Sequence, residues 1–135
     1  MSRIIVNIHS NDGIKTEIEG HNQGRLTVER TPPTGPTSGM GYGGGEILCF
    51  AAATCLYNNI QRLARDRAIT LHTVKIEVIG VWEDMNPSAQ EISLRPTVTA
   101  EINPDELKAL ICDAFGDSSV ANTLSHGVPV MLKLS

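Results

Sequence analysis

Three cysteines, Cys49, Cys55 and Cys112, are the most reactive side chains in this chain of 135 residues. A cysteine reacts as the thiolate, and an ordinary thiol pKa of about 8.5 leaves most of it protonated at neutral pH. A nearby cation, a metal ion or a helix N-terminus lowers that pKa. A thiol of this chain can therefore act as a nucleophile only if one of these groups lies close to it.

Cys55 lies in the segment from Gly43 to Asp66, which predicts a long helix. This helix carries no charge from Ile47 to Tyr57, and a helix that is apolar all round is expected to be buried all round. Cys55 is about three turns from the helix start, too far for the dipole of its own helix to act. Its activation must come from an arginine or a hydrogen bond of another segment, and otherwise Cys55 is a small buried hydrophobe.

The other two thiols have less distinctive positions. Cys49 precedes Cys55 by six residues, so the two point in different directions and cannot form a disulfide within one helix. We expect Cys49 to belong to the core. Cys112 falls on an amphipathic helix predicted over residues 104–115, where it borders the inward face, either as core packing or as a resolving thiol.

Glu46 stands at the start of the long helix, where the dipole stabilises a carboxylate. A functional alternative makes it the anchor of an arginine that reaches the thiol. A glycine-rich stretch before the helix lacks the preceding strand of a dinucleotide site. The histidines have no ligand spacing, so neither a metal ion nor a cofactor is expected; they are His9, His21, His72 and His126.

Composition excludes several classes of function. The formal net charge is -4 and no dense basic cluster occurs, which argues against a nucleic acid or an anionic membrane as partner. The apolar run over residues 47–57 is about half the length of a membrane span. An odd number of cysteines without a secretory signal predicts a reducing, cytoplasmic setting.

The order of elements predicts an α+β fold in a single domain over residues 1–135. Three alternating segments suggest an antiparallel meander, and a long loop then leads to the helix that carries Cys55. Asn103 is expected to cap the helix over 104–115. The expected strands are 3–9, 14–19, 24–30, 72–83, 91–102 and 128–134, and the expected helices are 43–67, 104–115 and 118–124.

Two motifs resemble the superfamily of osmotically inducible protein C (OsmC) and organic hydroperoxide resistance (Ohr) proteins. Residues 45–56, GEILCFAAATCL, are similar to the family pattern P-x-E-L-L-L-A-A-L-A-x-C-L at the start of its central helix. Residues 118–130, SSVANTLSHGVPV, are similar to its C-P-V-S-N-T-L-x-x-G-V-P-V near the C-terminus. The elements between them also fit, so the resemblance covers nearly the whole chain.

The resemblance implies antiparallel sheets around a long central helix, and an intertwined homodimer with both central helices at its centre. It further implies a thiol peroxidase that reduces organic hydroperoxides, with Cys55 as the peroxidatic thiol that becomes a sulfenic acid. A second cysteine then forms a disulfide, which a lipoylated or small thiol reduces.

The chain departs from that pattern at three positions. Ser118 stands where the family has its resolving cysteine. The acid expected ten residues before the thiol is replaced by Gly45, with Glu46 one place later. The arginine expected between hairpin and helix is absent from residues 31–45, and Arg30 is the nearest candidate.

The leading hypothesis is a dimeric, OsmC-like peroxidase in which Cys55 reacts with hydroperoxides in a one-cysteine cycle. Glu46 and Arg30 assist, and an external thiol resolves the sulfenic acid because Ser118 cannot. The rival is a non-catalytic dimer whose pocket around Cys55 binds a small apolar ligand. A third reading makes Cys112 the resolving thiol from a shifted position.

Overall fold

A computed structural model describes residues 3–10, 15–22, 24–29, 43–85 and 87–134. The chain divides into two compact units, residues 1–47 and 48–135. The prediction of a single domain over residues 1–135 therefore stays a prediction, and each unit is described by itself.

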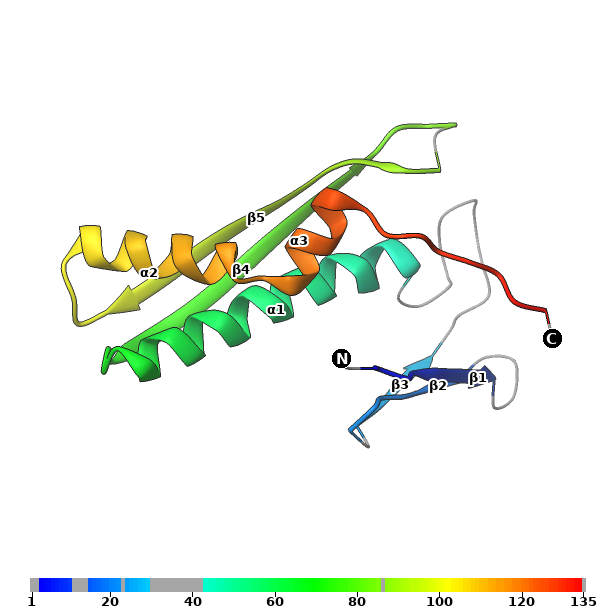
Figure 1. Ribbon diagram of the computed structural model, residues 1–135, viewed down its shortest axis with the longest axis horizontal. Helices are drawn as coiled ribbons and strands as arrows, with labels where there is room; N and C mark the ends of the chain where they lie inside the picture. Colours follow the sequence, from blue (N-terminus) through cyan, green and yellow to red (C-terminus); the bar gives the residue numbers. More distant parts are fainter. Residues whose placement is uncertain (1–2, 11–14, 23, 30–42, 86, 135) are drawn as a thin grey trace. The chain divides into compact units, whose positions relative to one another are not determined.

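The first unit is a three-stranded antiparallel meander (Figure 1), as the alternating segments predict. Its strands are β1 (Asn7–Ser10), β2 (Lys15–Glu19) and β3 (Arg25–Glu29), in the order β1-β2-β3. β1 is shorter than the expected strand over residues 3–9. Its ladder ends where Asn7 faces Glu19, the last residue of β2, so residues 3–6 have no strand to pair with there.

The second unit contains most of α1 (Gly44–Asp66) together with α2 (Pro104–Gly116) and α3 (Ser119–His126). Its sheet is one long antiparallel hairpin of β4 (Leu71–Trp82) and β5 (Ala89–Ala100). Figure 1 shows α1 and α2 running beside this hairpin, with α3 folded back toward the middle of α1. The expected cap of α2 is confirmed, because the Asn103 side chain accepts the Glu106 N–H at 2.9 Å.

The core of the second unit forms where α1 and α2 meet one face of the hairpin. Burial alternates along β4, so one face packs inward while the other stays exposed. The buried side chains come from α1, β5 and α2; they are Leu56, Ile60, Leu63, Ala64, Val98, Leu110 and Ala114. The mixed architecture confirms the predicted α+β class, with antiparallel sheets and three helices among the described residues.

Burial of α1 differs from the sequence expectation. Its buried residues lie on one side, whereas Phe50 is 67% exposed and Tyr57 is 43% exposed. The expectation of burial all round is therefore wrong for the single chain. An apolar side chain is left in water where none of the described elements of its unit covers it.

The expected strand over residues 128–134 is also wrong, because this segment has no regular secondary structure and pairs with none of the described strands. A strand needs a neighbouring backbone to satisfy its N–H and C=O groups, and none of the described strands lies in register with it. Alternating apolar residues predict which segment can pair, but not whether a partner is present in the same chain.

Truncation of Leu110 tests this core. The Leu110 side chain projects from α2 and is completely buried in the hydrophobic cluster. Leu110→Ala is expected to lower the free energy of unfolding by about 2–5 kcal/mol, because the cavity adds to the lost apolar contact. Met85→Ala, at a fully exposed side chain, is the control and is expected to change it by less than about 0.5 kcal/mol. Urea unfolding at one fixed protein concentration measures both, and equal effects would contradict this core.

Candidate active site

Cys55 is half-buried in the middle of α1, on the side of the helix that faces the junction between α2 and α3. The sulfur lies 3.7 Å from Oγ of Ser119, the first residue of α3. The two residues are 64 positions apart in the sequence, and they come from the two motifs that carry the family resemblance. The fold therefore brings the second motif onto the thiol of the first.

The start of α3 is defined by Ser118, which is completely buried. The Ser118 Oγ accepts the N–H of Ala121 at 3.1 Å, and its backbone carbonyl accepts the N–H of Asn122 at 2.9 Å. Serine is a favoured residue at this capping position because its hydroxyl satisfies an N–H that the helix cannot. A hydroxyl can accept and donate at the same time, so Ser118 can accept from Ala121 and still donate its hydrogen to another group.

The first turn of α3 sets the acidity of Cys55. Burial raises the pKa of the thiol. Hydrogen bonds from the Ser118 hydroxyl, the Val120 N–H, and the hydroxyl and N–H of Ser119 act in the opposite direction, and together they hold the pKa below its ordinary value. These groups point at the sulfur from a helix N-terminus, where the partial positive charge of the backbone favours an anion. The sequence left two sources of activation open, an arginine or a hydrogen bond of another segment. Among the described residues, it is hydrogen bonds from another segment that lower the pKa of Cys55.

Glu46 and Cys112 are not among the groups that set the pKa of the thiol. Glu46 is an exposed residue in the first turn of α1. Arg30 lies outside the described residues. Cys112 is exposed on α2, so the expectation that it packs as part of the core is wrong; its position on the wheel of α2 turns it away from the buried Leu110. Ser118, at the position where the resemblance implies a resolving cysteine, is the predicted residue that lies beside Cys55.

Cys49 belongs to a different environment from Cys55. Its sulfur is half-buried and packs against β4, about 2.9 Å from where a Cβ on Gly80 would stand. The ring of Trp82 crowds the same position, so Gly80 lets the helix thiol and the ring approach the strand. All three cysteines are free thiols.

Sequence reasoning missed Ser119 and Val120 as donors to the thiol. The signal was present, because the sequence predicts a helix that begins at Ser118, and the first N–H groups of any helix lack internal partners. What the sequence did not give is the packing of that helix end against α1. That packing depends on contacts between residues about 60 positions apart.

Residues 36–133 match the OsmC family, described as OsmC-like protein. This match covers well over half of the chain. The chain therefore belongs to the OsmC family. Comparison with curated proteins finds no match.

Solved structures of OsmC-like proteins share this fold. An OsmC-like protein from Mycoplasma pneumoniae matches with a TM-score of 0.75 and 18% identity, over 92% of this chain and 88% of that one. An organic hydroperoxide resistance protein OsmC from Legionella pneumophila matches with a TM-score of 0.61 and 16% identity, over 92% and 90%. The organic hydroperoxide resistance protein OhrB of Bacillus subtilis matches with a TM-score of 0.58 and 11% identity, over 90% of each chain. At these identities the likeness concerns the fold.

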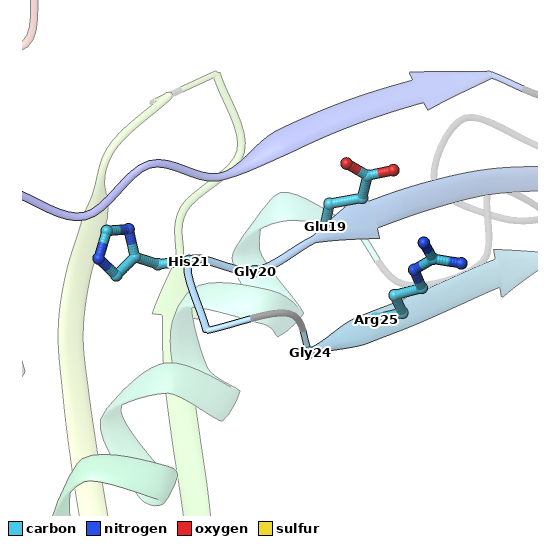
Figure 2. Close-up of a pocket in the computed structure, with 5 residues that line it drawn as sticks. All are labelled: Glu19, Gly20, His21, Gly24 and Arg25. Atoms are coloured by element: carbon cyan, nitrogen blue, oxygen red, sulfur yellow. The ribbon is translucent and has the colours of Figure 1, made fainter.

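A small polar hollow occurs in the first unit of this OsmC family member, at the turn between β2 and β3 (Figure 2). It is lined by Glu19, Gly20, His21, Gly24 and Arg25, none of which is a thiol. The Ile5 N–H donates to Nδ1 of His21 at 3.3 Å, so this ring nitrogen is already used within the unit. The hollow therefore offers no alternative to Cys55 as a nucleophile.

The described residues form neither a metal site nor a membrane-spanning helix. No group of three or more His, Cys, Asp or Glu side chains gathers there in a way that would hold a metal ion. None of the helices in that part of the chain is long and apolar enough to cross a membrane.

Removal of the Ser119 hydroxyl tests the donor cluster. Ser119→Ala is expected to raise the pKa of Cys55 and to slow its alkylation by iodoacetamide at neutral pH about two- to fivefold, as one neutral hydrogen bond implies. Ser125→Ala, at an exposed position later in α3, is the matched control. Mass spectrometry of the Cys55 peptide measures the rate, and an unchanged rate in Ser119→Ala would contradict this role.

Proposed function

We propose that this OsmC family member reduces organic hydroperoxides with Cys55 as the reacting thiol, in a one-cysteine cycle. The observation that carries the proposal is the position of the Cys55 sulfur at the start of α3, where hydrogen bonds lower its pKa. A thiolate is the form that attacks peroxides, and a lowered pKa raises its fraction at neutral pH. Two of the structural relatives are named organic hydroperoxide resistance proteins.

The proposed chemistry begins when the Cys55 thiolate attacks one peroxide oxygen. A sulfur–oxygen bond forms, the oxygen–oxygen bond breaks, and the alkoxide leaves and takes up a proton to become an alcohol. Cys55 is oxidised to the sulfenic acid and the hydroperoxide is reduced. One external thiol then forms a mixed disulfide with release of water, and a second thiol releases Cys55 and leaves as a disulfide.

Ser118 is the reason for proposing an external thiol. It lies beside Cys55 at the family's resolving position, but a hydroxyl does not form a disulfide. Cys112 is exposed on α2 and is the only other thiol of the second unit besides Cys49. A supply of reducing thiols fits a cytoplasmic setting. Glu46 and Arg30 are proposed to assist, as the family resemblance implies.

An organic rather than a small polar peroxide is favoured by the surroundings of Cys55 along α1. Ala51 and Leu48 lie one and two turns before Cys55 on the same side of the helix, and both are half-buried apolar residues. The residues about one turn after Cys55 on that side are the polar Asn58 and Asn59. The thiol therefore stands at the border between an apolar and a polar stretch, which suits an alkyl group bonded to a peroxide.

Oxidation by cumene hydroperoxide tests the proposed function. One equivalent is expected to add the mass of one oxygen atom to Cys55, in a form that dimedone traps, and to leave Cys55→Ser unmodified. Cys112→Ser is expected to behave as the natural chain does. No oxidation of Cys55 would favour the non-catalytic alternative, and a disulfide between Cys55 and Cys112 would overturn the one-cysteine cycle.

Ser118→Cys provides a sharper arm of the same experiment. It places a thiol within hydrogen-bonding reach of the sulfenic sulfur, so oxidation is expected to yield a disulfide between positions 55 and 118 instead of a dimedone adduct. Ser125→Cys, on the exposed part of α3, is the control and is expected to keep the adduct. The two outcomes are read by non-reducing peptide mapping.

The active assembly is proposed to be a homodimer. Support comes from apolar side chains that the single chain leaves in water on α1 and in residues 128–134; they are Phe50, Tyr57, Val130, Met131, Leu132 and Leu134. A second copy of the chain can cover α1 and offer a strand to the unpaired segment. Light scattering after gel filtration is expected to give twice 14.5 kDa, and a monomer mass at micromolar concentration would contradict the proposal.

A further inference from the structure

Three polar or reactive side chains on one side of α1 contact the junction between α2 and α3. Cys55, Asn59 and Arg62 are spaced four and then three residues apart, which puts them on one face of a helix. Besides the contact of Cys55 with Ser119, the Asn59 Nδ2 donates to the Ala114 carbonyl at 3.1 Å. The Arg62 Nη2 lies 3.3 Å from Oδ2 of Asp117.

The Ala114 carbonyl needs an external donor because α2 ends there. In a continuing α-helix, the N–H of Ser118 would bond to the carbonyl of Ala114. Here the chain turns, and the Ser118 N–H bonds to the Phe115 carbonyl at 3.0 Å instead. The Asn59 amide donates to the Ala114 carbonyl in place of the Ser118 N–H. This hydrogen bond fixes the point at which the chain leaves α2 and enters α3.

The other contacts near this end of α2 are less suited to that task. The Arg67 Nη2 lies 2.7 Å from Oδ2 of Asp113, but Arg67 follows the last residue of α1 and both side chains are more than one-third exposed. Arg62 is 44% exposed and lies within 4.0 Å of Asp66 as well as near Asp117, and an exposed ion pair contributes little. The Asn122 amide also bonds to a carbonyl near the end of α2, that of Gly116 at 3.1 Å, but it comes from α3 itself and gives no attachment to α1. Asn59 is half-buried and lies one turn from Cys55.

We propose that Asn59 is a positioning residue for Cys55, which keeps the first turn of α3 on the sulfur through its hydrogen bond to the Ala114 carbonyl. Asn59 itself is not required to touch the peroxide. The inference deepens the proposed function and rests on it for its catalytic meaning, but its effect on the thiol is measured without any peroxide.

The experiment follows the rate of Cys55 alkylation by iodoacetamide against pH, resolved by peptide mass spectrometry. Asn59→Leu removes the donor at similar size and is expected to move the profile to higher pH, with a rate at neutral pH about three- to tenfold lower. The plateau at high pH, where the thiol is fully ionised, is expected to stay unchanged. Asn59→Gln keeps the amide and is expected to restore part of the loss.

Asn58→Leu is the matched control, since Asn58 is the exposed direct neighbour of Asn59 and lies about 100° from it around α1. Its profile is expected to equal that of the natural chain. If Asn59→Leu does not fold, as judged by circular dichroism, Asn59→Ala replaces it, because it also lacks the donor but adds no apolar bulk. A change of the plateau by the same factor as the neutral rate would mean altered access to the thiol, and it would overturn the inference, as would an unshifted profile.

Oxidation of the natural chain by cumene hydroperoxide is measured in parallel with the pH profiles of Cys55 alkylation. A shifted Asn59→Leu profile together with an unoxidised natural chain would overturn the proposed function and leave Asn59 as the residue that positions the donors. An unshifted profile with an oxidised natural chain would overturn the role of Asn59 alone. The two failures are therefore distinguishable.

Discussion

The contact between the Cys55 sulfur and the first turn of α3 is the interaction on which the chemistry of this molecule depends. A thiol buried among aliphatic carbons is held in its protonated form, because burial disfavours the charged state. Here burial does raise the pKa of Cys55, but the hydroxyl and N–H groups at the start of α3 outweigh it. The same turn keeps the donors in place, since Ser118 is both the cap of α3 and a partner of the thiol.

The remaining elements of the second unit can be understood as support for that contact. The β4–β5 hairpin offers one apolar face, and α1 and α2 bury theirs against it, which sets the two helices side by side. The end of α2 is then attached to α1 by Asn59, and α3 begins directly beyond it. Ser118 stands where the sequence resemblance implies a resolving cysteine, and its hydroxyl can form hydrogen bonds at this point but not a disulfide.

Much of this was predictable from the sequence, and the failures have physical causes. Helix and strand positions follow from periodicity and capping, as Asn103 before α2 shows, and two motifs were enough to indicate the family. The donors of Ser119 and Val120 were not predicted, because no local pattern says which helix end meets a thiol 64 residues away. The strand expected over residues 128–134 and the full burial of α1 were wrong for the single chain, since both need a covering partner that apolar patterning does not specify.

The most direct test of the account is the ionisation of Cys55 itself. In a Cys49→Ala, Cys112→Ser background, the ultraviolet absorbance of the remaining thiolate is titrated against pH for the folded chain and for the chain in concentrated urea. The account predicts that the folded chain ionises at a lower pH than the unfolded chain, whose thiol should titrate near about 8.5. A folded-state midpoint equal to or above the unfolded one would contradict the claim that α3 activates this thiol.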